Sequence, residues 1–173
     1  MIETKSCTHF KGVKYSSLTA KQKELFNFQK IAATLADYGF NCIKLADDWQ
    51  GADFLAYHID HTTTLRVQLK SRVTIDQKYC GKGLWMAFPH KKSWYLIEHD
   101  RLVEKIREHT TWLDSNSWTN AQPNSKREFG AYSSVSINAS LLESLAEDRL
   151  GEVYGPILAD DEETADSTEP SRG

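Results

Sequence analysis

The first clear pattern of apolar positions lies between residues 20 and 38, where apolar side chains recur at the spacing of a helix. The repeating residues are Leu25, Phe28, Ile31, Ala32, Leu35 and Tyr38. Thr19 with Gln22 three residues later fits a capping box, and Gly39 fits the glycine that commonly follows a helix. Glu24 lies on the same side of the predicted helix as this stripe, so we expect one carboxylate to face the rest of the fold.

After this helix the chain changes to the alternation of apolar and polar residues that is typical of strands. Strands are predicted over residues 40–46, 53–59, 64–73, 84–88 and 94–97, with a loop over 47–52. Two further helices are predicted, over 101–109 with Asp100 as its N-cap and over 140–150, whereas 110–137 is polar and stays unassigned. This order of elements predicts an α/β or α+β domain, and we take it as α/β with a central mixed sheet flanked by helices.

The second and third predicted strands form a hairpin if residues 60–63 make its turn. In that register Asp53 lies opposite Lys70, and Gln68 points to the same face as Lys70, because side chains alternate along a strand. Asp53, Gln68 and Lys70 are therefore predicted to converge at one end of the hairpin. The alternative is structural: Asp53 and Lys70 form an ordinary cross-strand ion pair, Gln68 lies on the surface, and Glu24 only borders its apolar stripe.

The residue types at this point are those that metal-assisted hydrolysis of a phosphodiester requires. The Asp53 carboxylate and the Gln68 amide oxygen are hard donors that suit Mg²⁺ or Mn²⁺, and Mg²⁺ needs few protein ligands because it keeps several waters. A lysine beside the metal can orient or deprotonate a water, or hold a phosphate as a point charge. Glu24 is a further carboxylate directed at the sheet.

These motifs resemble those of the PD-(D/E)XK nuclease superfamily. The matching residues are Glu24 on a first helix, Gly51-Ala52-Asp53-Phe54-Leu55 at the start of one strand, and Val67-Gln68-Leu69-Lys70-Ser71 on the next. The segment from Asp47 to Leu102, with LWMAF and SWYLIEHDRL, is most similar to small predicted intron-associated and homing-type endonucleases. The resemblance covers residues 20–107. It implies a restriction-endonuclease-like αβββαβ core, a divalent metal and DNA as the substrate.

The resemblance also implies a role for each residue. Asp53 is the main metal ligand, Gln68 replaces the second acidic ligand, Lys70 is the catalytic lysine, and Glu24 matches a helical glutamate of some branches. Gln68 departs from the pattern, which has Asp or Glu there, and the lost negative charge is expected to weaken metal binding. We therefore expect a Mg²⁺- or Mn²⁺-dependent DNA endonuclease. The alternative is a catalytically weak or inactive nuclease-like fold that binds nucleic acid or a protein partner.

The distribution of charge changes what the net charge of −3 says about partners. Residues 159–173 contain six acidic residues and one arginine, a net charge of −5, and the other 158 residues carry +2. Residues 64–107 contain ten basic and four acidic residues with aromatic residues among them, a composition that suits DNA and also an ordinary solvated face. The expected nucleic-acid contacts are Arg66, Arg72, Lys78, Lys82 and Trp49.

Length and composition predict one domain over residues 1–158, with an arm over 1–17, a core over about 18–109 and a loop-rich part over 110–158 that we expect to supply any homodimer interface. The segment 159–173 has no aromatic or branched apolar residue and is predicted to be a disordered acidic tail. The sequence has no apolar run of membrane-spanning length and no signal peptide, so we expect a cytoplasmic protein that does not contact membranes. Its three cysteines lack the spacing of a disulfide framework or a zinc site.

Overall fold

The elements of the fold were located in a computed structural model that describes residues 11–120 and 126–151. They are α1 (Ala20–Ala36), β1 (Phe40–Trp49), β2 (Ala52–His58), β3 (Thr64–Leu69), β4 (Val73–Asp76), β5 (Trp85–His90), β6 (Ser93–Glu98), α2 (His99–His109), α3 (Asn116–Thr119), β7 (Ala131–Ser134), α4 (Ala139–Ser144) and β8 (Arg149–Leu150). The short 3-10 helices are η1 (Tyr15–Ser17), η2 (Gln77–Tyr79), η3 (Trp112–Asp114) and η4 (Ala146–Asp148). The predicted tail over 159–173 and residues 1–10 of the predicted arm lie outside the described residues.

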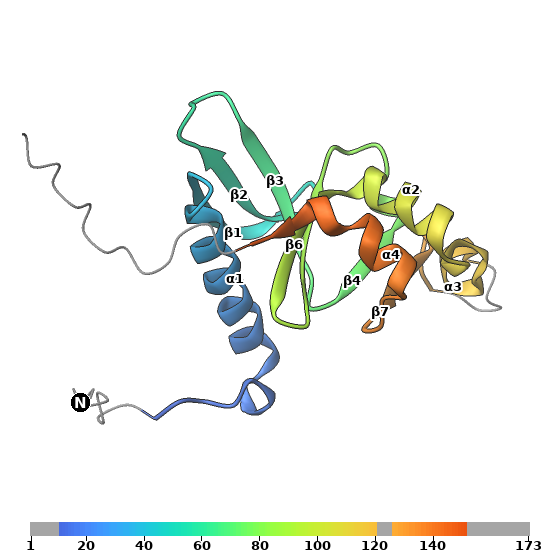
Figure 1. The fold of residues 1–173 in the computed structure, drawn as a ribbon, viewed down its shortest axis with the longest axis horizontal. Helices are drawn as coiled ribbons and strands as arrows, with labels where there is room; N and C mark the ends of the chain where they lie inside the picture. Colours follow the sequence, from blue (N-terminus) through green and yellow to red (C-terminus); the bar gives the residue numbers. More distant parts are fainter. Residues whose placement is uncertain (1–10, 121–125, 152–173) are drawn as a thin grey trace, which may run out of the picture.

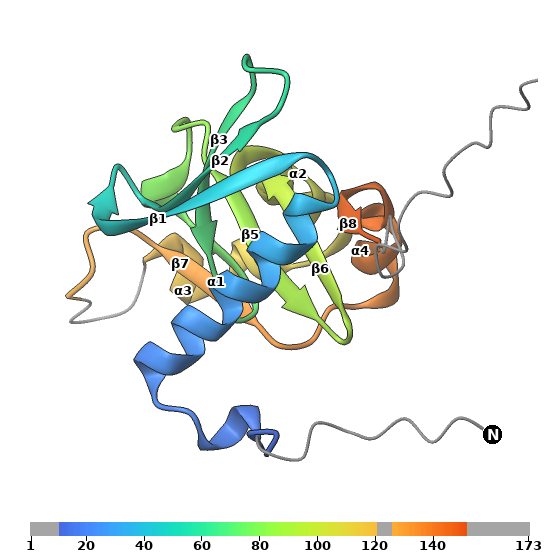
Figure 2. The same cartoon turned by 90° about the vertical axis from the view of Figure 1, so that its left-hand side faces the viewer.

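Six strands form one mixed sheet in the order β1-β2-β3-β5-β6-β8. Neighbouring strands are antiparallel except β3 and β5, which are parallel. Strands β4 and β7 form a separate antiparallel pair. Helix α1 covers one face of the large sheet, and α2 and α4 cover the other (Figures 1 and 2). The predicted α/β class, with a central mixed sheet flanked by helices, is confirmed.

The connection from β3 to β5 differs from the predicted core in one element. Parallel strands require a crossover connection, which is usually an α-helix. Here the crossover contains β4 and η2 instead. Helix α1, the meander β1-β2-β3 and the parallel strand β5 follow the αβββαβ order, with β4 and η2 in the place of its second helix.

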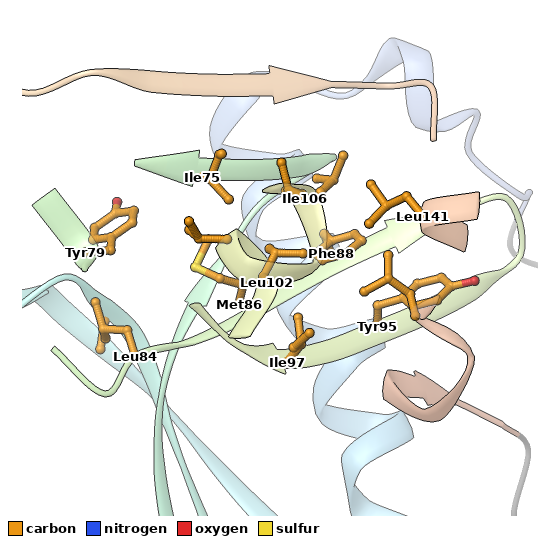
Figure 3. Close-up of a cluster of buried hydrophobic side chains, with 14 residues drawn as sticks. Ile75, Tyr79, Leu84, Met86, Phe88, Tyr95, Ile97, Leu102, Ile106 and Leu141 are labelled. Carbon is orange, nitrogen blue, oxygen red and sulfur yellow. The ribbon is translucent and has the colours of Figure 1, made fainter. Parts of the chain in front are cut away.

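Alternating side chains on the sheet fill two separate cores. On the α1 side, Ile31 and Leu35 of the helix pack with buried residues of four strands, among them Phe54, Val67 and Ala87. On the other side, helices α2 and α4 pack against the alternate residues of β5 and β6, as Figure 3 shows for Met86, Phe88, Tyr95 and Ile97 with Leu102, Ile106 and Leu141. Residues of β3 that point away from Val67 therefore lie on the face opposite α1.

Helix α1 begins and ends where local sequence signals place it. The Thr19 hydroxyl accepts from the Gln22 backbone N–H, and the Gln22 side chain accepts from the Thr19 backbone N–H, so the predicted capping box is confirmed. Gly39 has a φ of +79°, as expected for the residue that redirects the chain after a helix. Neither α1 nor any other helix in the described ranges has the length and apolar character that crossing a membrane requires.

The predicted loop over residues 47–52 was wrong, because β1 continues to Trp49. Strands β1 and β2 are joined by Gln50 and Gly51, whose φ angles of 56° and 92° are both positive. Two central residues with positive φ are the requirement of the type I′ turn that joins tightly paired strands. The β1–β2 pairing register shifts between Lys44 and Trp49, so the extra residues of β1 are accommodated by an irregularity in the pairing.

The predicted register of the β2–β3 hairpin was shifted by two residues. Leu55 pairs with Arg66 and Tyr57 with Thr64, so Asp53 lies across from Gln68 and not from Lys70. A longer connection causes the shift, because the Asp60 carboxylate accepts backbone N–H bonds from Thr62 and Thr63, both at 2.8 Å. An even shift leaves every side chain on its predicted face.

Three further boundaries differ from the prediction. The strand predicted over 64–73 ends at Leu69, and after a bend a new strand, β4, begins at Val73. Helix α2 begins at His99 with Glu98 as its N-cap, so Asp100 lies in its first turn. The helix predicted over 140–150 ends at Ser144, because the chain continues through η4 into β8, which pairs with β6.

Candidate active site

Asp53 and Gln68 meet where β2 begins and β3 ends, on the sheet face opposite α1. The Asp53 Oδ2 atom accepts hydrogen bonds from the Gln68 side-chain Nε2 and, at 2.8 Å, from the Leu69 backbone N–H. Within the part of the chain that the structure describes, the second oxygen, Oδ1, accepts no hydrogen bond. Asp53 therefore presents one carboxylate oxygen that is available to a ligand.

The surroundings of Asp53 disfavour its charged form. Burial raises the pKa of the Asp53 carboxyl above its usual value, and the nearby charge of Glu24 acts in the same direction. The hydrogen bond from Leu69 and the charges of Lys70 and Lys44 oppose this rise without cancelling it. A carboxylate in such a place gains stability from a further cation, which is the electrostatic requirement of a metal ligand.

Gln68 is oriented by Tyr79, a residue that the sequence analysis did not identify. Both side chains are buried, and the Tyr79 hydroxyl donates a 2.9 Å hydrogen bond to Gln68 Oε1. The amide oxygen therefore points to Tyr79 and the amide nitrogen to Asp53. Tyr79 lies in η2, in a stretch without periodicity, so no sequence signal placed it beside Gln68. In this orientation Gln68 acts as a hydrogen-bond donor to Asp53.

Lys70 is the first residue after β3, and the sheet holds its backbone. Its N–H donates to the Ala87 carbonyl of β5 at 2.9 Å. Its ammonium nitrogen lies 5.7 Å from the centre of the Tyr79 ring, and its charge acts on the pKa of Asp53. Lys70 therefore lies near enough to Asp53 to act on its charge, although not through the predicted cross-strand pairing.

Glu24 lies at the margin of this group. Its carboxylate is exposed and ion-paired with Lys44 Nζ at 2.6 Å, so α1 is linked there to β1. Lys44 pairs with Phe54, the neighbour of Asp53, in the β1–β2 ladder. Glu24 and Lys70 line the same hollow of about 380 Å³. Lys44 was missed by the sequence analysis, because the strand pattern of residues 40–46 does not reveal which helix residue it meets.

The residues expected to contact nucleic acid do not share one environment. Arg66 binds protein atoms, since its guanidinium donates to Gln50 Oε1 at 2.6 Å and to the Lys82 carbonyl oxygen. Trp49 is half exposed at the end of β1, beside Gln50. Arg66 therefore connects the β1–β2 turn to the loop before β5.

The other basic residues, Arg72, Lys78 and Lys82, follow Lys70 in the chain between β3 and β5. Arg72 is exposed in the bend between β3 and β4. Lys78 Nζ lies 3.7 Å from Asp76 Oδ2 and 4.8 Å from the centre of the Tyr79 ring. Lys78 and Lys82 line a cleft of about 690 Å³ together with Lys70. Lys70 therefore belongs both to the candidate site and to the lining of a cleft with basic residues.

A second group of side chains has the composition of a metal site. The ligand atoms of Cys80, His99 and Asp100 lie within 4.8 Å of one another. The Nε2 atom of the buried His99 faces the backbone N–H of Asp76 at 3.2 Å, so the ring proton lies on Nδ1, 3.3 Å from Asp100 Oδ1. Burial lowers the pKa of His99 and keeps the ring neutral. The nitrogen that faces the group is thus a donor, and the group fits a hydrogen-bonded core histidine better than a metal site.

Comparison with known proteins found a likeness among solved structures. No protein-family model matches the chain, and no curated protein matches its sequence. Among solved structures, Hjc, a Holliday junction resolvase from Archaeoglobus fulgidus, is similar over 45% of this chain and 74% of its own, with 15% sequence identity and a TM-score of 0.35.

Proposed function

We propose that this protein is a metal-dependent nuclease of the PD-(D/E)XK type that hydrolyses phosphodiester bonds in DNA. The observation that carries the proposal is the meeting of the Asp53 carboxylate, the Gln68 amide and Lys70 where β2 begins and β3 ends. The spacing of these residues in the sequence matches the motifs that the superfamily uses for this chemistry. The expected metal is Mg²⁺ or Mn²⁺, and the expected activity is that of an endonuclease.

The donor groups of the site fit a hard divalent cation. Asp53 Oδ1 is not used by the hydrogen bonds that reach Oδ2, and burial raises the pKa of Asp53 above its usual value. Mg²⁺ keeps several waters and needs only one or two carboxylates, so this small donor set is sufficient. When bound, such a metal lowers the pKa of a coordinated water and stabilises negative charge on a phosphate.

Gln68 can serve the proposed site in two orientations. As described above, its nitrogen faces Asp53 and its oxygen accepts from Tyr79. Rotation of the amide by half a turn directs the oxygen toward Asp53 and the nitrogen toward the Tyr79 hydroxyl, which can accept a hydrogen bond as well as donate one. Tyr79 therefore satisfies the buried amide in both orientations, and Gln68 can present an oxygen when a cation binds.

The chain's own residues supply the remaining parts of the proposed chemistry. Lys70 provides a positive charge beside Asp53, where it can hold a phosphate oxygen or orient a water. The Glu24–Lys44 pair borders the site and adjusts its net charge. Cutting both strands of a duplex requires two such sites, so we also propose a homodimer.

The test is cleavage of plasmid and labelled duplex DNA by the full chain with Mg²⁺, Mn²⁺ or EDTA. We expect cleavage only with metal, and Lys70→Ala is expected to lower the rate roughly 10²-fold or more, the effect of removing a charge-stabilising donor. Lys30→Ala is the matched control, because it removes an exposed lysine on α1, outside the proposed site. This variant should cleave at the normal rate. Cleavage in EDTA, or unchanged cleavage by a folded Lys70→Ala variant, would refute the proposal.

A second candidate function is a nuclease-like fold that binds nucleic acid or a protein without catalysis. The observation that favours it is the Gln68 amide nitrogen, which faces Asp53 where the family pattern has an acid. Gln68→Glu separates the two candidates when Mn²⁺ binding is measured by calorimetry. Tighter Mn²⁺ binding by the variant supports a working metal site. No Mn²⁺ binding by either protein supports the non-catalytic fold.

A further inference from the structure

We propose that the basic cleft beside Lys70 binds an unpaired DNA strand, so that the preferred substrate is a duplex with a single-stranded flank. This inference rests on the proposed nuclease function and names the substrate class of the same site. The cleft has a volume of about 690 Å³, and Lys70 of the proposed site is one of its lining residues. A strand whose phosphate is held by Lys70 can therefore reach into it.

The walls of the cleft are built from the paired strands β4 and β7. Val73 and Ile75 of β4 are buried in the core, so the alternate residues Thr74 and Asp76 point into the cleft. On β7, Ser133 pairs with Thr74. The pairing of β4 with β7 holds this wall together.

Contacts behind the wall hold it in place. Tyr132 of β7 stacks on Trp112, with ring centres 4.9 Å apart. The Gln77 backbone N–H donates to the Gly130 carbonyl at 2.9 Å. Gly130 packs so closely on α3 that a Cβ atom there would lie 1.6 Å from the Trp118 carbonyl oxygen. These contacts make the cleft a preformed groove.

The charges of the cleft suit a polyanion. Among the described residues, the lining has four basic side chains, Lys70, Lys78, Lys82 and Arg127, and two acidic ones, Asp76 and Glu128. Lys78 already neutralises part of the Asp76 charge at 3.7 Å. A lining with more basic than acidic side chains suits a phosphate backbone.

The size and the aromatic lining favour one strand over two. Pockets of roughly 300–1,000 Å³ hold ligands of drug-like size, which is the scale of a few nucleotides and too small for a duplex. Phe129 lines the cleft and is 43% exposed, so part of its side chain is open to a base. Single-stranded nucleic acid is commonly bound in this way, by a basic groove with an aromatic ring for stacking.

The experiment measures DNA binding by the full chain in EDTA, where no cleavage is expected, by fluorescence anisotropy. The probes are a blunt duplex, the same duplex with a single-stranded overhang, and the overhang strand alone. We expect the overhang duplex to bind about tenfold more tightly than the blunt one, and Phe129→Ala to remove that difference. Lys82→Ala is expected to weaken binding of the overhang duplex more than that of the blunt duplex.

Tyr57→Ala is the matched control, because Tyr57 is 42% exposed, much like Phe129, but lies on β2 away from the cleft. Phe129→Leu keeps the apolar volume without the aromatic face, so it tests stacking if Phe129→Ala fails to fold. The inference is overturned if the blunt and overhang duplexes bind with equal affinity and Phe129→Leu changes neither affinity. The proposed nuclease function would still stand if metal-dependent cleavage occurred, whereas absence of both cleavage and DNA binding would refute both proposals.

Discussion

At the scale of single residues, the candidate site is a chain of hydrogen bonds that ends at one carboxylate. Tyr79 donates to Gln68, and Gln68 donates to Asp53. The Tyr79 hydroxyl, both ends of the Gln68 amide and Asp53 Oδ2 thus have partners, as is usual for buried polar groups. Asp53 Oδ1 accepts no hydrogen bond from the described residues, and the proposed function places the metal there.

Tyr79→Phe should destabilise the protein. The substitution leaves Gln68 Oε1 buried without its 2.9 Å donor, and an unsatisfied buried acceptor costs about 1–3 kcal/mol. Denaturant unfolding of the two proteins measures the difference. Tyr57→Phe, at an exposed position, serves as the control and should change the stability by less than about 0.5 kcal/mol. Equal losses in both variants would contradict the role assigned to the Tyr79 hydroxyl.

Asp53→Asn should stabilise the metal-free protein at neutral pH. The pKa of Asp53 is raised in the folded state, so the native protein favours the protonated form, and stability falls as pH rises through that pKa. Asparagine keeps an oxygen for the Leu69 N–H and the Gln68 amide but carries no charge. We expect the melting temperature in EDTA to rise by about 2–4 °C at pH 7, with the difference vanishing in acid as Asp53 becomes protonated. A lower melting temperature at pH 7 would contradict the burial argument.

At the scale of elements, the site depends on how α1, β1 and the β3–β4 bend meet. Helix α1 brings Glu24 to Lys44 of β1, and the bend directs Lys70 toward η2 and Tyr79. The charges of Glu24 and Lys44 act on Asp53 in opposite directions. The pair therefore influences the electrostatics of the site more than the stability of the fold, because exposed ion pairs contribute at most about 1 kcal/mol.

Substitutions of Glu24 and of Lys44 should change the affinity for a metal ion in opposite directions. Glu24→Gln removes a negative charge near Asp53, so we expect Mn²⁺ to bind a few-fold more weakly, on the order of 1 kcal/mol. Lys44→Met removes a positive charge and should strengthen binding by a similar factor. Calorimetric titration of both variants with Mn²⁺ gives the comparison. Shifts of the same sign in both variants would show that the charges of the pair do not control the site.

At the scale of the whole molecule, the distribution of charge matters more than its sum. The tail over 159–173 carries −5 and the other residues +2. The structure adds that four basic residues line one cleft, and Lys70 of the candidate site is among them. A covalently attached acidic segment raises the local concentration of negative charge that competes with DNA for such a cleft.

Deletion of residues 159–173 should therefore tighten DNA binding, most of all at low salt, where charges are least screened. Anisotropy titrations of the full and shortened chains across a range of salt concentrations measure this. A full-length variant with its six tail acids replaced by Asn and Gln separates charge from length and should behave like the deletion. Unchanged affinity at low salt would leave the tail a solubilising role only.

Prediction and structure agree best for features that depend on residues close together in the sequence. The capping box of α1 is a contact over three residues, and the shared face of Asp53 and Gln68 follows from the two-residue period of a strand. Both were readable from the chain. The register of the β2–β3 hairpin was not, because the hydrogen bonds of Asp60 lengthen the connection beyond the four residues assumed.

The sequence by itself determined the α/β class, the helix that carries Glu24, and the grouping of Asp53 with Gln68, because local periodicity and capping specify these features. Only the tertiary structure decided the orientation of Gln68, the ion pair of Glu24 and the cleft beyond Lys70. Tyr79 reaches Gln68 across eleven residues and Lys44 reaches Glu24 across twenty. Contacts of that range arise when separate elements pack together, and the pattern of neither partner encodes where the other will lie.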